Sequence, residues 1–234
     1  MLAGRGTKFY WDALVAEFLG SMFLVMVAVA PVILFGKVFE ASKGLMVFAN
    51  AVGVAFVLAA FIEMFGPISG AHFNPVVTLV MLLEKKIGTT KAALFVLCQF
   101  AGGIVGMVCT HLMFFDDVGT VMALSHNVRN GYVFVGEIFG TFILLLTILL
   151  LVKTGSQKIS IMVGLLVGGQ VMATSSTMFA NPQVTLARMF TNTPSGIRPW
   201  DGLVFMAMQT IGALLAYGVY KITFAKNTYG KDEA

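Results

Sequence analysis

Two asparagines, Asn74 and Asn181, are the residues of this sequence whose type and spacing point most directly to chemistry. Each opens the same short motif: residues 74–79 read Asn-Pro-Val-Val-Thr-Leu and residues 181–186 read Asn-Pro-Gln-Val-Thr-Leu, so five of six positions agree. Asn is a favoured helix N-cap and Pro fits the first helical turn, so each motif predicts a loop that ends abruptly in a helix. The amide oxygen would cap the helix, and the amide NH2 would be left to donate hydrogen bonds.

The helices that follow these motifs must be short. The first reaches the charged run Glu84-Lys85-Lys86 and the second ends near Phe190. This leaves roughly nine residues, or ~14 Å, for each, which is about half of a ~30 Å hydrocarbon layer. Two such helices entering from opposite sides would meet at the midplane. Their N-terminal dipoles would repel cations and hydronium there, whereas two amide donors would suit neutral molecules that accept hydrogen bonds.

The composition indicates an integral membrane protein. Of the 234 residues, 58% are hydrophobic and 11% are charged, with a mean hydropathy of +0.91, which excludes an ordinary soluble domain. The net charge of +4 comes from basic residues spread between apolar spans, so membrane topology explains it better than nucleic-acid binding. We find no metal-ligand cluster, phosphate loop or nucleophile and base pair, so no cofactor, metal or enzymatic activity is expected.

Apolar stretches and an internal repeat define the expected architecture, an all-α membrane domain with six spanning helices and two re-entrant half-helices. Residues 16–20, Ala-Glu-Phe-Leu-Gly, match residues 136–140, Gly-Glu-Ile-Phe-Gly, at the start of the two halves. We therefore expect one repeat over residues 1–126 and a second over 127–234. Three spans in each half are an odd number, so the second repeat is inverted in the membrane. The spans are expected at residues 11–35, 45–65, 92–115, 131–152, 159–174 and 200–220.

The distribution of basic residues predicts the orientation of the chain. In this topology, ten of the Lys and Arg residues fall on the side of the termini and five on the other, which places both termini in the cytoplasm. The ten are Arg5, Lys8, Lys85, Lys86, Lys91, Lys153, Lys158, Lys221, Lys226 and Lys231; the five are Lys37, Lys43, Arg129, Arg188 and Arg198.

These features together resemble the aquaporin or major intrinsic protein family, which includes the glycerol-conducting aquaglyceroporins. The resemblance rests on residues 69–75 (Ser-Gly-Ala-His-Phe-Asn-Pro), the paired half-helices, the paired Glu-x-x-Gly and the inverted repeat, and it spans essentially the whole chain. It implies a homotetramer in the lipid bilayer of the cell membrane, plasma or inner, with one pore per protomer. The family's usual central motif is Asn-Pro-Ala twice, but here Val76 follows Pro75 and Gln183 follows Pro182.

The resemblance also implies a selectivity filter near the outer mouth, and this chain departs from the usual one. The family usually has Arg three residues after the second Asn, where this chain has Val184. Spacing transfers the other filter positions to Val54, Gly169 and Met178. Val171 replaces Gly169 if the second loop is two residues shorter than usual. Such a ring lacks the bulky donors of a water filter, so it is expected to be wider and more apolar.

Several polar residues are expected to support this pore. Glu17 and Glu137 are costly within a membrane and are expected to accept backbone N–H groups from the loops before the half-helices. His72 is expected to brace its loop, since no cluster accompanies it that would bind a metal. Gln183 is expected to pack where the half-helices meet, with contact to the lumen as the alternative. Arg188 lies one turn beyond Val184 and is either a displaced charge at the outer mouth or a cap of the helix C-terminus.

The expected function is passive conduction of water and small uncharged solutes, such as glycerol-like polyols or neutral metalloid acids. Two alternatives stay open: a water-selective pore, and a structural or junctional membrane protein whose pore conducts poorly.

Overall fold

The computed structural model describes residues 10–226, and in that part of the chain it consists of helices and loops without strands. Arg5, Lys8 and Lys231 of the charge count lie outside the described residues, as do the outer ends of the two expected repeats. The first half contains α1 (Trp11–Ile33, continued by a π-helical turn, Leu34–Val38), α2 (Lys43–Ser69), α3 (Pro75–Leu83), α4 (Thr89–Met113) and α5 (Phe115–Val118). The second half contains α6 (Val133–Lys153), α7 (Ile159–Ala173), α8 (Pro182–Arg188) and α9 (Pro199–Val219, continued by a π-helical turn, Tyr220–Phe224).

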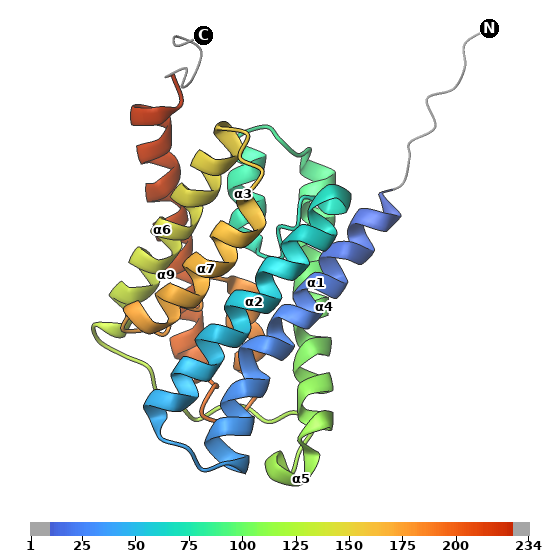
Figure 1. The fold of residues 1–234 in the computed structure, drawn as a ribbon, viewed down its shortest axis with the longest axis vertical. Helices are drawn as coiled ribbons and strands as arrows, with labels where there is room; N and C mark the ends of the chain where they lie inside the picture. The colour runs from blue at the N-terminus through green and yellow to red at the C-terminus, as the bar shows by residue number, and fades with distance from the viewer. Residues whose placement is uncertain (1–9, 227–234) are drawn as a thin grey trace, which may run out of the picture.

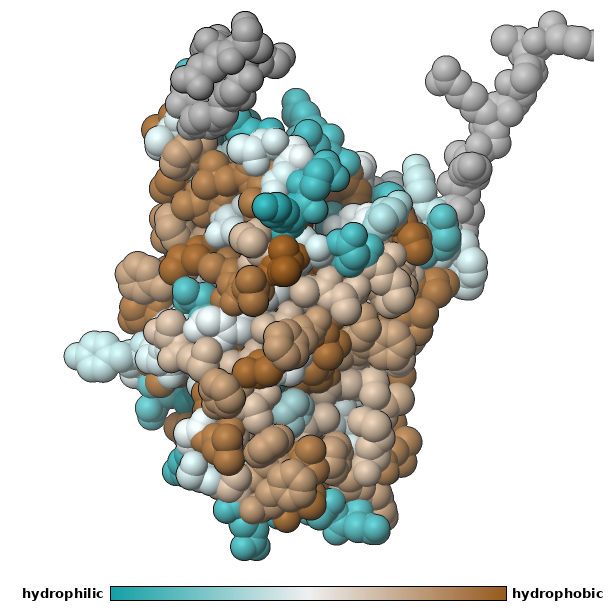
Figure 2. Space-filling view, in the orientation of Figure 1, coloured by the Kyte–Doolittle hydropathy of each residue, from teal (hydrophilic) through white to brown (hydrophobic). Residues whose placement is uncertain are grey.

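Long apolar helices form the body of the molecule. By length and composition, α1, α2, α4, α6 and α9 are each able to cross a membrane, and α7 is an apolar helix of 15 residues. Hydrophobic side chains cover the middle of the face seen in Figure 2, and hydrophilic side chains gather at its upper and lower ends. This distribution fits a protein whose middle is surrounded by lipid.

The two halves use the same helix pairing. α1 packs against α4 in the first half as α6 packs against α9 in the second, and α2 packs against α7 where the halves meet (Figure 1). The first turn of α1 and the last turn after α9 lie at the same end of the bundle, at the top of Figure 1. We call this the terminal end and the other the opposite end.

Small residues allow the tight contact between α1 and α4. A Cβ atom at Gly102 would lie 2.2 Å from the backbone oxygen of Phe18, and one at Gly106 would lie 2.3 Å from that of Met22. Any larger residue at these two positions would push the helices apart. The backbones therefore approach as closely as in other membrane helix pairs with small residues at the interface.

The two short helices enter from opposite sides. α2 ends at the terminal end, where Gly70 adopts φ 95° as a left-handed C-cap, and the chain then turns inward to Asn74 before α3 runs back outward. α2 ends four residues later than predicted because its helix continues past Pro67 to this cap, and it begins two residues earlier. α7 and α8 repeat the arrangement from the opposite end. α8 has seven residues and not nine, since its last turn tightens to bonds such as Phe190 N to Ala187 O.

Candidate functional site

Asn74 and Asn181 cap the helices that they precede. Each has extended backbone angles, with φ −156° and −155°, and each side-chain oxygen accepts a hydrogen bond of 3.1 Å, from Val76 N and Gln183 N respectively. This is the capping geometry that the two motifs predict. Both side chains are at least nine-tenths buried and face the same cavity, so the caps hold them in place beside it.

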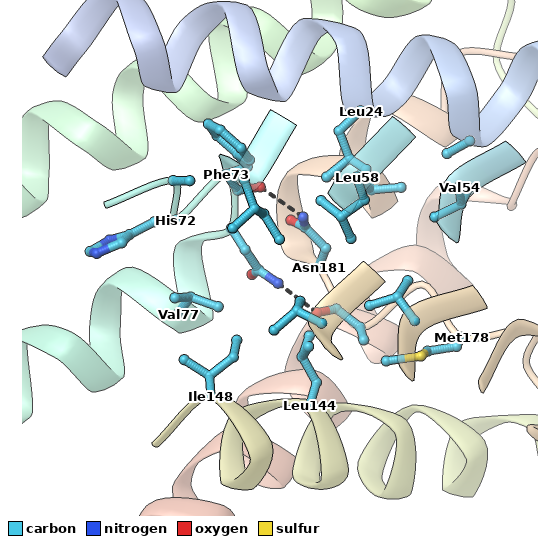
Figure 3. A pocket seen from close by; sticks show the side chains of 18 of the residues that line it. Leu24, Val54, Leu58, His72, Phe73, Val77, Leu144, Ile148, Met178 and Asn181 are labelled. Atoms are coloured by element: carbon cyan, nitrogen blue, oxygen red, sulfur yellow. Dashed lines mark hydrogen bonds between the residues drawn. The ribbon is translucent and has the colours of Figure 1, made fainter. Parts of the chain in front are cut away.

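Each Asn also binds the loop that precedes the other. Asn74 Nδ2 donates to Ala180 O and Asn181 Nδ2 donates to Phe73 O, both at 2.8 Å, as Figure 3 shows. Since a side-chain amide has two N–H donors, this exchange leaves one on each Asn for a molecule in the cavity. The NH2 groups are therefore less free than the sequence suggests, but they are also more rigidly placed.

The loops before the two Asn residues have an unusual backbone that is the same in both halves. The residues one and three positions before each Asn have positive φ: Phe73 and Ala71 at 46° and 49°, and Ala180 and Met178 at 47° and 40°. Non-glycine residues rarely adopt such angles, which cost of order 1–3 kcal/mol each. Other contacts must therefore hold both loops in this shape.

Glu17 and Glu137 supply those contacts, as expected from the sequence. The Glu17 carboxylate accepts from His72 N at 2.9 Å and Phe73 N at 2.8 Å. Glu137 accepts from the matching atoms, Phe179 N at 2.9 Å and Ala180 N at 2.8 Å. Both carboxylates are fully buried, so these charge-assisted bonds offset the cost of placing a carboxylate inside the bundle.

A glutamine links each carboxylate to the neighbouring half-helix, and the sequence analysis missed both. Gln99 Nε2 donates to Glu17 at 2.7 Å and to Thr78 Oγ1 at 2.9 Å. Gln209 Nε2 donates to Glu137 at 2.6 Å and to Thr185 Oγ1 at 2.8 Å. An isolated Gln within the last apolar span of each half was the signal that pointed to them.

A cavity of about 280 Å³ lies between the two half-helices. Its lining includes Lys86 beyond the end of α3, Asn74 and Asn181 in the middle, and Arg188 at the end of α8. Between these polar residues the wall is mostly apolar, and Figure 3 shows Leu58, Leu144 and Ile148 among the side chains around it. The cavity thus passes the ends of both half-helices, as a lumen through the bundle would.

The structure places Val54, Met178, Val184 and one of the two alternatives for α7 along this lumen. Val54, Met178 and Val184 line it and are buried. Gly169 is exposed on α7 and is not part of the lining, whereas Val171 is buried and lines the lumen. Of the two residues expected for the α7 position, Val171 is therefore the one that faces the lumen.

Gln183 and Val76 lie behind the lumen. Both are buried, and neither is part of its lining. Gln183 Nε2 donates to Phe73 O at 3.3 Å, the same carbonyl that Asn181 binds, and its side chain packs over Gly103, where a Cβ atom would lie 2.2 Å from the amide oxygen. This position at the junction of the half-helices is the first of the two expected for Gln183.

His72 and Arg188 both line the lumen and bind protein atoms. His72 Nδ1 lies 3.0 Å from Thr78 Oγ1 of α3, which fits the bracing role expected for it. Arg188 is 4% exposed, its Nη2 donates to Ala28 O at 2.5 Å, and its Cζ lies 4.1 Å from the centroid of the Phe179 ring. Arg188 therefore does not extend to the solvent. Among the described residues, no group of three or more His, Cys, Asp or Glu is placed to bind a metal.

Two re-entrant helices that meet beside a lumen in a bundle of apolar helices define this molecule as a membrane channel. The chain belongs to the major intrinsic protein family, whose sequence model matches residues 5–180. This finding confirms the resemblance and the fold class expected from the sequence.

The chain is similar in sequence to known aquaporins and aquaglyceroporins, and similar in fold to a solved aquaglyceroporin. The chain is 37% identical over 208 residues to the Aquaglyceroporin AqpS of Rhizobium meliloti (strain 1021), covering 88% of each chain. It is 29% identical to Aquaporin-4 of Bos taurus over 96% of this chain and 71% of the relative. The fold resembles the X-ray structure of the aquaglyceroporin from Plasmodium falciparum with a TM-score of 0.72, at 18% identity, over 93% of this chain and 98% of the other.

Proposed function

We propose that this protein is a passive channel for water and small uncharged solutes, with glycerol-like polyols and neutral metalloid acids as its solute classes. The observation that carries the proposal is that Val54, Val171, Met178 and Val184 are buried and line the lumen. We infer that these four side chains form an apolar ring around it. None of these side chains offers a hydrogen-bond donor, so the ring neither competes strongly for water nor excludes solutes by means of a large cation. A solute with a carbon skeleton gains contact with this wall.

The centre of the lumen supplies the hydrogen-bond donors that an apolar ring lacks. The remaining N–H groups of Asn74 and Asn181 face the cavity and would bind the oxygen atoms of a passing solute. The N-termini of α3 and α8 point to the same place and disfavour positive charge there. Together these features support passage of neutral molecules and exclusion of cations and protons.

The assembly and location are part of the same proposal. We infer a homotetramer with one lumen per protomer, made of the repeats 1–126 and 127–234, in the plasma or inner membrane. Both termini face the cytoplasm in this proposal, so the opposite end, toward which α8 runs, is the outer mouth. The surplus of basic residues on the terminal side supports this orientation. Arg188 would then lie on the outer side of the apolar ring.

Stopped-flow light scattering on proteoliposomes tests the proposal. Outward gradients of water, glycerol and arsenite at neutral pH distinguish the candidate functions. Fast passage of water and at least one of the two solutes, relative to protein-free vesicles, supports the proposal. Passage of water alone indicates a water-selective pore, and passage of neither indicates a structural or junctional protein. As a control, size-exclusion chromatography before reconstitution checks that the purified protein is a correctly assembled tetramer.

A further inference from the structure

The carbonyl oxygens of Phe73 and Ala180 occupy matching positions in the two halves, but they are bound differently. Phe73 O accepts from Asn181 Nδ2 at 2.8 Å and also from Gln183 Nε2 at 3.3 Å. Ala180 O accepts from Asn74 Nδ2 at 2.8 Å, and no second donor to it lies among the described residues. The two asparagines at the centre of the lumen are therefore not equivalent, because Asn181 shares its acceptor with another side chain and Asn74 does not.

Two positions of the sequence produce this difference. Gln183 stands where the first repeat has Val76, and a valine side chain has no donor. The long amide fits because Gly103 of α4 leaves room for it: a Cβ atom there would lie 2.2 Å from Gln183 Oε1. In the second repeat Ala213 takes the place of Gly103, each lying four residues after the glutamine that binds a loop-bracing carboxylate. The second donor thus belongs to one half alone.

Gln183 is placed to hold Phe73 O when Asn181 leaves it. Its bond of 3.3 Å is longer than the usual distance of about 2.9 Å, so it can shorten once the competing donor moves away. Asn181 Oδ1 accepts from Gln183 N as the helix cap, and a small tilt of the amide that keeps this bond takes Nδ2 off the carbonyl. A carbonyl that loses its last donor at a mostly apolar wall is costly, and Gln183 removes this cost at Phe73.

We propose that Gln183 is a positioning residue that allows Asn181 to release Phe73 O and donate both of its amide N–H groups to a solute. Asn74 has no such substitute at Ala180 O, so it keeps one N–H on the protein and offers the other. Gln183 itself touches no solute, since it is buried behind the lumen wall. The ligand class is a small neutral compound with several hydroxyl groups, because two of its oxygens can accept from one NH2 group. This inference rests on the proposed function and names the side of the lumen centre that adapts to the solute.

The exchange matters more for glycerol than for water. A water molecule keeps hydrogen bonds to the waters before and after it in the lumen, so it loses little if the wall offers one donor fewer. Glycerol replaces several waters at once, and the wall around it is mostly apolar. Its hydroxyl oxygens therefore depend on the asparagines, and a second N–H from Asn181 lowers the barrier that glycerol meets when it sheds its own water. Removing the Gln183 donor should lower the ratio of glycerol to water permeability.

The test is stopped-flow permeability of water and glycerol in proteoliposomes with the full-length chain. Gln183→Met removes the donor and keeps the length of the side chain, so the space over Gly103 stays filled. If that variant does not assemble, Gln183→Ala removes the donor without adding apolar bulk. Thr141→Val is the matched control, because Thr141 is a fully buried residue of the same repeat whose hydroxyl has no partner among the described residues, and it is not part of the lumen lining. Each variant is also made in an Asn181→Ala background.

We expect Gln183→Met to lower the ratio of glycerol to water permeability about fivefold, the effect of one hydrogen bond, and Thr141→Val to leave it unchanged. In the Asn181→Ala background Gln183→Met should cause no further change, because Gln183 acts through Asn181. An equal loss in both backgrounds, which a purely structural role would produce, overturns the proposal. A wild-type ratio in both Gln183 variants also overturns it, and the proposed function stands in either case. A wild-type protein that passes water but no glycerol overturns both.

Thermal unfolding in detergent gives a second reading that does not depend on conduction. Asn181→Ala leaves Phe73 O with the Gln183 donor, whereas Asn74→Ala leaves Ala180 O with no side-chain donor. We therefore expect Asn74→Ala to lower the unfolding temperature more than Asn181→Ala does, and the two losses to become equal in the Gln183→Met background. Equal losses in the wild-type background would show that Gln183 does not take over Phe73 O, and would overturn the proposal.

Discussion

The side chains of Asn74 and Asn181 each donate a hydrogen bond, 2.8 Å long, to the backbone carbonyl of the residue directly before the other. The two half-helices are thereby joined through the residues that cap them. One change at either Asn alters a helix cap, a bond between the repeats and a donor facing the lumen. The relationship makes the centre of the channel a single unit, in which a structural and a conducting role belong to the same side chains.

Replacing Asn181 by Leu should lower both stability and conduction. The change removes a cap that contributes ~1 kcal/mol and the bond to Phe73 O, and it places an apolar group where the lumen has a donor. We expect a lower thermal unfolding temperature in detergent and reduced water and glycerol permeability in the tetramers that remain folded. Asn181→Asp keeps an acceptor for the cap but adds negative charge, so it should admit cations in planar-bilayer recordings. Unchanged solute and ion permeability in both folded variants would show that Asn181 does not face the conducting path.

Val184→Arg should convert the channel toward water selectivity. The variant places a large cation with several donors in the apolar ring, next to Val54 and Met178 on the same lumen. Glycerol permeability is expected to fall much more than water permeability in stopped-flow measurements. Val184→Met is the control, because it adds length without charge and should affect glycerol less. Equal losses of water and glycerol permeability in Val184→Arg would instead place the constriction elsewhere.

The α7 position of the ring has a direct test. Val171→Phe adds bulk to a buried side chain that lines the lumen, so we expect it to reduce glycerol permeability several-fold. Gly169→Leu is two residues away on the exposed side of the same helix, where a Cβ atom would meet nothing within 4 Å. It should leave permeability unchanged. A stronger effect at position 169 than at position 171 would restore the assignment made from sequence spacing.

Glu137→Gln should destabilise the fold of the second loop. The carboxylate accepts from Phe179 N, Ala180 N and Gln209 Nε2, and an amide would present a donor to one of these donors. Hydrogen bonds to charged groups contribute about 1.5–3 kcal/mol each, so we expect a loss of about 3 kcal/mol and a lower unfolding temperature. Glu63→Gln is the control, since the exposed Glu63 accepts a bond from Ser160. If Glu137→Gln unfolds at the same temperature as the control, Glu137 does not hold the second loop in its strained shape.

Local chemistry made the half-helices and their braces predictable. Asn followed by Pro has a strong preference for a helix start, and a Glu in an apolar span requires several donors, so Asn74, Asn181, Glu17 and Glu137 could be assigned from the sequence. The same reasoning extended to the glutamines would have found Gln99, which shares its apolar span with few other polar groups. These assignments depend on the residue and its immediate neighbours.

Tertiary geometry decided what the sequence left open. The choice between Gly169 and Val171 depends on the path of the loop back to the middle of the bundle, which is held by hydrogen bonds that Phe179 N and Ala180 N donate to Glu137. The direction of the Arg188 side chain depends on Ala28 of α1, which is 160 residues away in the chain. The bond from Gln183 to Phe73 O depends on the space that Gly103 of α4 leaves for the amide.

Blocking the lumen chemically is the measurement that tests most directly whether solute passes between the half-helices. Val77 lines the lumen on α3, whereas Cys98 and Cys109 on α4 do not. In a background with Cys98→Ala and Cys109→Ala, Val77→Cys provides a thiol in the proposed path. Methanethiosulfonate labelling of this variant should abolish glycerol permeability in proteoliposomes, and reduction should restore it, while the cysteine-free background is unaffected. Glycerol permeability that persists after complete labelling at position 77 would contradict passage through this lumen.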